Sequence, residues 1–272
     1  ADYPTALCDI PDPPPILWVR GAPEVWARPC IALVGARNAS SLGLRMARAL
    51  AGGLSENGFA VVSGLARGID TAAHMASLDA GTVAVLAGGV DVLYPAENAP
   101  LAEDAVTKGG ALISEAPMGL QPKARHFPAR NRIISGLSRA LVVVEAASKS
   151  GSLITARAAV DQGREVLAVP GHPFDARAAG CNMLIRDGAR LVRGVDDVLE
   201  ALPPAPQPAQ ADLPLPHPAG PNTPPKPERS LAETAALHRR ILERLGPSPL
   251  AEDQLIRDLR LPAATVSAGL VE

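Results

Sequence analysis

One repeating unit dominates the chain from Ile31 to about Leu202: a short apolar run, a Gly-rich loop and then a helical stretch. The apolar runs predict strands at residues 31–35, 60–63, 82–87, 111–114, 140–145 and 165–169. They show no strict alternation of apolar and polar residues, as is usual for strands that are buried on both faces. Strands that alternate with helices predict an α/β fold with a parallel sheet flanked by helices. In such a fold, ligands bind at the carboxyl ends of the strands.

Composition argues against several classes of protein. Hydrophobic residues make up 47% of the 272 residues, yet no apolar run approaches the ~20 residues of a membrane-spanning helix, so we expect a soluble protein without membrane contact. Residues 1–4 have no feature of a secretory signal. Cys8, Cys30 and Cys181 are odd in number and lack C-x-x-C spacing, so we expect neither a disulfide framework nor a metal site. A reducing cytoplasm fits this pattern best.

The chain divides into four predicted parts: an extended Pro-rich arm, an α/β domain, a Pro-rich linker and a small C-terminal unit, at residues 1–29, 30–202, 203–229 and 230–272. The linker is predicted to be stiff because residues 203–227 contain eleven prolines. The C-terminal unit begins with a capping box at Ser230 and continues in helical patterns typical of a helix-turn-helix. Acidic residues offset its basic ones, so we favour a structural or protein-binding role over DNA reading there.

The first predicted strand ends in a turn, Gly35-Ala36-Arg37-Asn38-Ala39-Ser40, which opens a helix with Ser40 as its N-cap. Such a turn presents backbone N–H groups and a positive helix dipole to an anion, for which phosphate is the obvious candidate. It is not a dinucleotide fingerprint, because Arg37 replaces the second glycine and no acidic residue closes the second strand. We therefore expect no nicotinamide cofactor. The alternative is that Gly35 only makes a tight turn.

The second strand runs into Ser63-Gly64-Leu65-Ala66-Arg67-Gly68. Its glycines permit close backbone approach, and Arg67 would project at the same sheet edge as Arg37, which predicts a two-point phosphate clamp. The alternative is a solvated loop arginine. His74, on the helix that follows, is expected to pack in the fold rather than to bind a ligand.

The strongest charge signal lies between Glu115 and Glu145, a stretch without an intervening carboxylate that contains Lys123, Arg125, Arg130, Arg132 and Arg139. Phe127 lies inside this stretch, although aromatic residues make up only 3% of the chain. Rings flanked by cations hold unpaired bases, because the ring stacks on the base while the cations follow the phosphates. Core packing of Phe127 is the alternative to this binding role.

A second small-residue turn, Ser150-Gly151-Ser152, opens another helix and is a further candidate anion site. Glu145 ends the strand before it, as the acid of a glycosyl-cleaving Rossmann-like enzyme does, but no second acid or nucleophile stands in a recognised relation to it. The nucleophile-elbow, metalloprotease and P-loop motifs are absent from the sequence. We therefore expect no catalytic activity. The alternative is a hydrolase of a nucleotide derivative that uses Glu145 as acid and the Gly35 turn as phosphate cradle.

The chain resembles the DprA/Smf family in six motifs that occur in the same order: Val34–Arg37, Ser63–Asp70, Tyr94-Pro95, Phe127–Ile134, Ser150–Ala156 and Gly163–Gly171. The resemblance covers roughly residues 3–202, and the C-terminal unit is similar to that family's winged-helix domain. Two features differ: the N-terminal helical domain of many members is absent, and the chain stops before wing strands would form.

The resemblance implies an extended Rossmann-like homodimer that binds and shields single-stranded DNA and helps to load RecA during natural transformation. It implies roles for Arg37, for Arg67 and for Phe127 with Arg130 and Arg132, whereas Lys123 and Arg125 correspond only loosely. Together with the motif reasoning, it predicts a DNA-binding set of Gly35, Arg37, Ser63, Gly64, Arg67, Lys123, Arg125, Phe127, Arg130, Asn131, Arg132, Ser150, Gly151 and Ser152. No metal or cofactor is expected.

Overall fold

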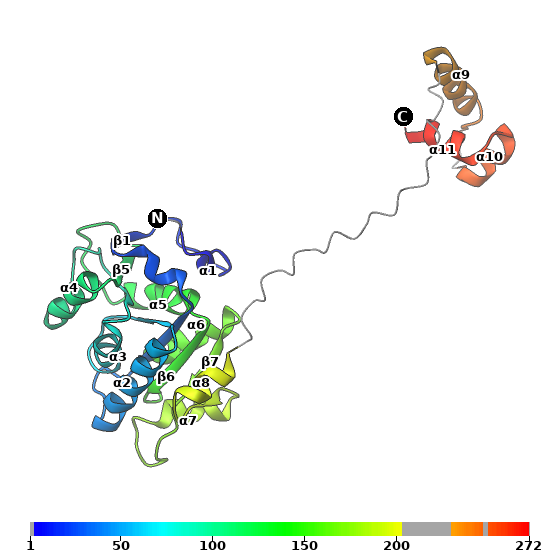
Figure 1. The fold of residues 1–272 in the computed structure, drawn as a ribbon. Coiled ribbons are helices and arrows are strands. Elements are labelled where there is room, and N and C mark those ends of the chain that lie inside the picture. The colour runs from blue at the N-terminus through cyan, green and yellow to red at the C-terminus, as the bar shows by residue number, and fades with distance from the viewer. Residues whose placement is uncertain (1–2, 203–229, 247–249, 272) are drawn as a thin grey trace. The chain divides into compact units, whose positions relative to one another are not determined.

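Figure 1 shows the computed structural model of the chain, which describes residues 3–202, 230–246 and 250–271. The chain divides into two compact units, residues 1–205 and 206–272, and each packs around its own apolar core. The predicted linker, residues 203–229, lies outside the described residues.

The first unit is built on a sheet of eight strands among the described residues, in the order β1-β5-β4-β3-β2-β6-β7-β8. The strands are β1 (Trp18–Gly21), β2 (Cys30–Gly35), β3 (Ala60–Ser63), β4 (Thr82–Val85), β5 (Ala111–Ser114), β6 (Ala140–Glu145), β7 (Glu165–Ala168) and β8 (Arg190–Leu191). β2 to β8 pair in parallel, whereas β1 pairs antiparallel with β5. The predicted α/β fold is confirmed, although the sheet is only mostly parallel because the N-terminal arm supplies an edge strand.

Helices cover both faces of this sheet (Figure 1). They are α1 (Thr5–Cys8), α2 (Ser41–Glu56), α3 (Ile69–Ser77), α4 (Ala99–Thr107), α5 (His126–Leu137), α6 (Ser152–Asp161), α7 (Ala179–Arg186) and α8 (Val195–Ala201), with short 3-10 turns at Pro23–Ala27 and Ala96–Asn98. Successive strand residues point to opposite faces. Ile31 and Leu33 of β2 pack with α2, α3 and α8, whereas Ala32 and Val34 pack with α5 and α6. This double burial explains the continuous apolar runs in the sequence.

The N-terminal arm fastens α5 from outside the sheet. The side chains of Leu7 and Ile10 are buried and lie so close to Gly136 that a Cβ there would meet both at 2.9 Å. Arg164 donates from its Nη2 to the carbonyl oxygens of Ala6 and Gly136, each at 2.9 Å. The arm therefore holds the helix that carries Phe127 at its other end.

The second unit contains α9 (Leu231–Leu242), α10 (Glu252–Leu259) and α11 (Ala263–Val271). The predicted capping box of Ser230 is present, since its hydroxyl accepts from the Glu233 backbone N–H and the Glu233 side chain accepts from the Ser230 backbone. A small core of Leu237, Ile241, Leu255, Leu259 and Val266 joins the three helices. The helices predicted for this unit are present, and few apolar side chains pack between them.

The topology fixes where a ligand site should lie. From β2 the chain continues through β3, β4 and β5 toward one edge of the sheet, and from β6 it continues through β7 and β8 toward the other. The connections that leave β2 and β6 therefore diverge and open a crevice at the carboxyl ends of these two strands, which is where α/β sheets bind their ligands.

Candidate nucleic-acid interface

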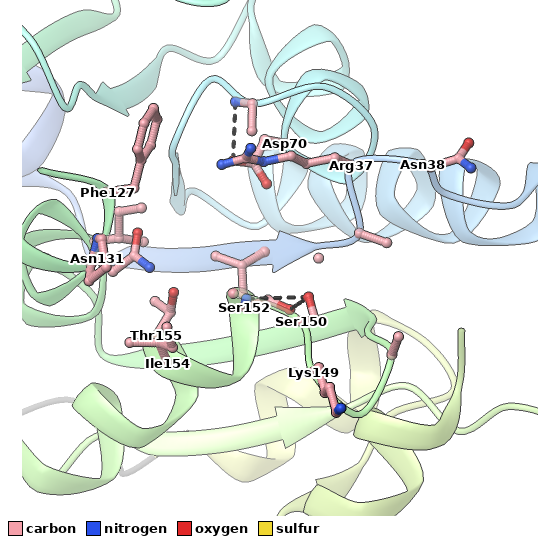
Figure 2. A pocket seen from close by; sticks show the side chains of 18 of the residues that line it. Arg37, Asn38, Asp70, Phe127, Asn131, Lys149, Ser150, Ser152, Ile154 and Thr155 are labelled. Atoms are coloured by element: carbon pink, nitrogen blue, oxygen red, sulfur yellow. Dashed lines mark hydrogen bonds between the residues drawn. The ribbon is translucent and has the colours of Figure 1, made fainter. Parts of the chain in front are cut away.

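A cavity of about 680 Å³ fills this crevice. Its walls come from the turn after β2, the first half of α5, and the loop and first turn of α6. Figure 2 shows Arg37, Asp70 and Phe127 along one side of it, and Ser150, Ser152 and Thr155 along the other. The structure therefore brings together residues from four of the motifs that the sequence singled out: Val34–Arg37, Ser63–Asp70, Phe127–Ile134 and Ser150–Ala156.

Phe127 and Arg37 form one wall. The guanidinium carbon of Arg37 lies 5.3 Å from the centroid of the Phe127 ring, within the range of a cation–π contact. The Tyr94 ring lies 5.8 Å from the same centroid at a tilt of 58°. Phe127 is half-buried and belongs to none of the apolar cores of the described residues. An aromatic face with a cation beside it thus borders the cavity.

Tyr94 is a site residue that the motif reasoning left unassigned. Its ring is 52% exposed, and it lines a small hollow next to the main cavity together with Arg37 and Arg67. One of only two tyrosines, placed in the loop after β4 at the same sheet edge, was the available signal.

Arg130 lies below Phe127 and is almost fully buried, with 5% of its surface exposed. Its Nη1 donates to the carbonyl of Val85 at 2.9 Å, and a Cβ at Gly64 would collide with the same nitrogen, so the glycine leaves room for the guanidinium in this position. Burial lowers the pKa of Arg130 to about 10, against the opposing attraction of the Asp70 carboxylate. The side chain stays charged at neutral pH. Its buried Nε has no partner among the described residues, which leaves a donor beside the cavity.

Asp70 holds the loop between β3 and α3. Its Oδ2 accepts from the backbone N–H groups of Gly64 at 3.1 Å and Ala66 at 3.3 Å. Burial raises the pKa of Asp70, while the Arg130 charge and these two donors act against that rise. Asp70 thus supports the preceding loop and lies close enough to Arg130 for the two charges to attract each other.

The opposite wall is the N-terminal end of α6. Gly151 is the N-cap and offers no side-chain hydrogen bond, while the hydroxyls of Ser150 and Ser152 lie 2.7 Å apart. Lys149 is exposed on the same loop. This end combines the helix dipole on which the predicted anion site was based with a cation that the prediction did not include.

The N-terminal end of α2 differs from expectation, because the chain places its own anion there. The Glu145 carboxylate accepts from the Ser40 backbone N–H at 3.0 Å and also from the Ser40 hydroxyl. It is buried, and a Cβ at Gly43 would lie 2.4 Å from its Oε2. Gly35 itself is packed against Ile69, where a Cβ would meet Cγ1 at 2.6 Å. The Gly35 turn thus shapes the crevice, and the helix end behind it is already neutralised.

Of the other predicted residues, some line a cavity and some are buried in the sheet. Arg67 is exposed, lines the hollow beside Phe127 with Arg37, and lies 3.4 Å from Glu97 in an exposed ion pair. Asn131 is half-buried and lines the main cavity. Ser63 is fully buried and donates its hydroxyl to the Leu33 carbonyl at 2.6 Å, so it supports the sheet.

The cationic stretch does not form one patch. Arg132 faces the N-terminal arm and forms ion pairs with Asp12 at 3.0 Å and Glu115 at 2.6 Å. Lys123 and Arg125 are exposed in the turn before α5 and line neither of the cavities that contain Phe127. The physical reason is helical geometry, because residues 130 and 132 lie on different sides of α5.

Within the described residues, no group of three or more His, Cys, Asp and Glu side chains is placed to hold a metal ion. No described helix is both long and apolar enough to cross a membrane. His74 is buried, with its Nδ1 2.8 Å from the Thr82 hydroxyl, and burial lowers its pKa to about 3.

Comparison with known proteins identifies the family of the chain. Residues 1–203 match the family of DNA recombination-mediator protein A, and residues 225–272 match the DprA winged helix domain. The chain belongs to the DprA family. DNA processing protein DprA of Streptococcus pneumoniae is 46% identical over 199 residues, which cover 72% of this chain and 70% of that protein.

Two solved DprA structures share the fold. The S. pneumoniae protein has a TM-score of 0.70 and 43% identity, covering 74% of this chain and 71% of that one. DNA processing protein A from Helicobacter pylori has a TM-score of 0.69 and 27% identity, covering 74% and 92% of the two chains, and its structure concerns a single-stranded DNA binding mode. Membership in the DprA family makes the chain a DNA-processing recombination mediator, and the resemblance seen in the sequence is confirmed.

Proposed function

We propose that this chain binds single-stranded DNA with little regard to sequence, and that the cavity between α5 and α6 is the binding site. The observation that carries the proposal is the pairing of the Phe127 ring with Arg37 on one wall and the N-terminal end of α6, with Lys149 beside it, on the other. An unpaired base would stack on the ring, and phosphates would lie between the cations and the helix end. The binding mode of the H. pylori relative supports the same ligand.

The cations that face solvent at this sheet edge support sequence tolerance. Arg37 and Arg67 lie on the β2 and β3 side, and Lys149 lies on the α6 side. Cations bind the phosphate groups of DNA, which are the same whatever the base sequence. If about four phosphates are neutralised, the logarithm of the association constant should fall against the logarithm of salt concentration with a slope near −3, at ~0.7 per contact.

Fluorescence anisotropy with a labelled single strand and the matching duplex, each across a salt series, tests this function. We expect tighter binding to the single strand and the salt slope given above. Preference for the duplex, or affinity that does not change with salt, would refute it.

We further propose that the bound strand is shielded and passed to RecA, and that two copies of the chain act together as a homodimer in the cytoplasm during DNA uptake and recombination. The recombination-mediator family supports RecA as the partner. The edge strand β8, where Leu191 is 45% exposed, is a surface on which a second copy can pair. Light scattering tests the dimer, and the rate at which RecA hydrolyses ATP on a strand covered by a single-strand-binding protein tests the loading.

We propose no catalytic activity. The alternative hydrolase needs Glu145 as a free acid, and both oxygens of that carboxylate accept hydrogen bonds from Ser40. Incubation with nucleotides should release neither base nor phosphate, and release of either would favour the hydrolase instead.

A further inference from the structure

A loop between β7 and α7 presents the most exposed large apolar side chain of the described residues. Phe174 is 94% exposed, whereas the chain contains only three phenylalanines. An aromatic ring that stays in water in the folded state adds no burial free energy to folding, whereas the same ring in a core would. A ring kept in this position is therefore a candidate for contact with a ligand.

The loop that carries Phe174 is held in one conformation. The Asn182 side chain bonds Gly171 twice, accepting from its backbone N–H at 3.1 Å and donating to its carbonyl at 3.0 Å. Within the loop, the Asp175 N–H donates to the His172 carbonyl and the Ala178 N–H donates to the Asp175 carbonyl, both at 2.9 Å. The ends of the loop touch, since a Cβ at Gly171 would lie 2.4 Å from that of Ala178. Phe174 is thus presented from an ordered support.

A second aromatic ring widens this surface. The ring centroids of His172 and Phe174 lie 5.6 Å apart at an angle of 38°. His172 also lines a second cavity of about 360 Å³, whose walls include the apolar side chains of Val144, Val169 and Cys181. A pair of rings beside an apolar hollow suits a flat, mostly apolar ligand with polar edges, as an unpaired base is.

Cations join this surface to the first cavity. Arg177, at the end of the same loop, lines the 680 Å³ cavity together with Lys149. Its Nε lies 3.2 Å from the Asp175 carboxylate, which lines the second cavity. Arg177 therefore lines the first cavity while the Asp175 carboxylate repels phosphates from the second. Both effects favour phosphates on the Lys149 and Arg177 side and bases on the ring side.

We propose that the loop 171–178 is a second station for single-stranded DNA, in which Phe174 and His172 stack a base further along the strand while Arg177 and Lys149 hold the phosphates that connect it to the Phe127 cavity. This inference rests on the proposed DNA-binding function. It extends that function because it assigns a longer footprint and a second stacking platform to a surface outside the Phe127 cavity. The chemistry at the loop, rings next to cations, favours DNA over a second copy of the chain as the occupant.

The test compares a short oligothymidine of about 6 nucleotides with a long one of about 20, a range that brackets common single-strand site sizes. Phe174→Ala should weaken binding of the long strand about fivefold or more and change binding of the short strand by less than twofold. The matched control is Ile16→Ala, another exposed apolar side chain at 63%, located in the N-terminal arm. Because Phe174 packs in no core of the described residues, the melting temperature of the Phe174→Ala variant should equal that of the wild type.

Fluorescence gives a readout that a merely structural role would not move. In Phe174→Trp, the emission of the new indole should be quenched when the long strand binds and should change little with the short one. The two native tryptophans, Trp18 and Trp26, provide the background, which the wild-type protein measures separately.

The possible outcomes distinguish failure of the proposed DNA-binding function from failure of the second station. A wild-type protein that binds neither strand defeats the proposed function itself. A wild type that binds both strands, with Phe174→Ala unchanged on both or weakened equally on both, overturns the second station alone. Loss of the dimer in Phe174→Ala, measured by light scattering, would assign the ring to a contact between copies and would also overturn it.

Discussion

Replacement of Phe127 by Ala separates a base-stacking ring from a structural one. Base–aromatic stacking is worth ~1–3 kcal/mol per base, so the dissociation constant for a single strand should rise by about 5-fold to 150-fold. The slope of affinity against salt should stay the same, since a neutral ring displaces no counterions. The affinity loss and the unchanged slope together are the signature of stacking.

The effect of the same substitution on stability follows from the contacts of the ring. Phe127 contacts Tyr94 at 5.8 Å between centroids and Arg37 at 5.3 Å, Arg130 lies at the 6.0 Å limit of a cation–π contact, and the ring is only half-buried. An aromatic pair contributes ~0.5–1.5 kcal/mol and an exposed cation–π contact ~0.5–1 kcal/mol, so removal of the ring should lower the free energy of unfolding by about 1–2.5 kcal/mol. Truncation of a core phenylalanine would instead cost ~3–5 kcal/mol.

Anisotropy titrations at several salt concentrations and a thermal melt measure both quantities on one preparation. A Phe127→Ala protein that binds normally but melts far below the wild type would refute the stacking role and return Phe127 to the core.

Three further outcomes are expected. Arg37→Ala should weaken binding and also flatten the salt slope by ~0.7, the share of one phosphate contact; an unchanged slope in the same titration would remove Arg37 from the phosphate path. A chain that ends at Leu202 should keep its single-strand affinity to within about tenfold, ~1.4 kcal/mol, whereas a larger loss in a gel shift would move the site to the C-terminal unit. His74 has a folded-state pKa of about 3, below its ordinary value, so the unfolded chain binds the proton first as pH falls and stability is lost between ordinary and folded pKa. Denaturant titrations should therefore show the wild type losing about 2 kcal/mol more than His74→Asn from pH 7 to pH 5, and equal losses would contradict this.

The sequence predicted the interior of the sheet well and its edges poorly. Strands such as residues 60–63 and 140–145 are buried on both faces, and their apolar runs are unmistakable. β8 has only two residues and shows no pattern of its own. β1 became part of the sheet through pairing with β5, a contact that joins residues far apart along the chain.

The candidate site shows the same division between local and distant effects. Arg37 and Phe127 were predicted from their own motifs, and both border one cavity. Charge counting treated Arg130 and Arg132 alike, although helical spacing places Phe127, Arg130 and Asn131 on one side of α5 and Arg132 on another. The bond between Glu145 and Ser40 joins residues 105 positions apart and leaves no local signal. Chemistry carried by neighbouring residues can be predicted from one sequence, whereas contacts between residues far apart along the chain cannot.

The position of the crevice between β2 and β6 has a consequence for biogenesis. One wall is contributed by residues near 37 and 127 and the other by residues near 151, so neither half of the chain contains the whole cavity. A nascent chain that ends at β5 can pair its β-strands, but it lacks α5, α6 and the loop before α6, which supply most of the cavity walls. If this cavity is the DNA site, affinity arises only when the contacts between distant parts of the chain close, and a bound strand in turn stabilises those same contacts. DNA binding at the proposed site would thus report that the first unit has folded.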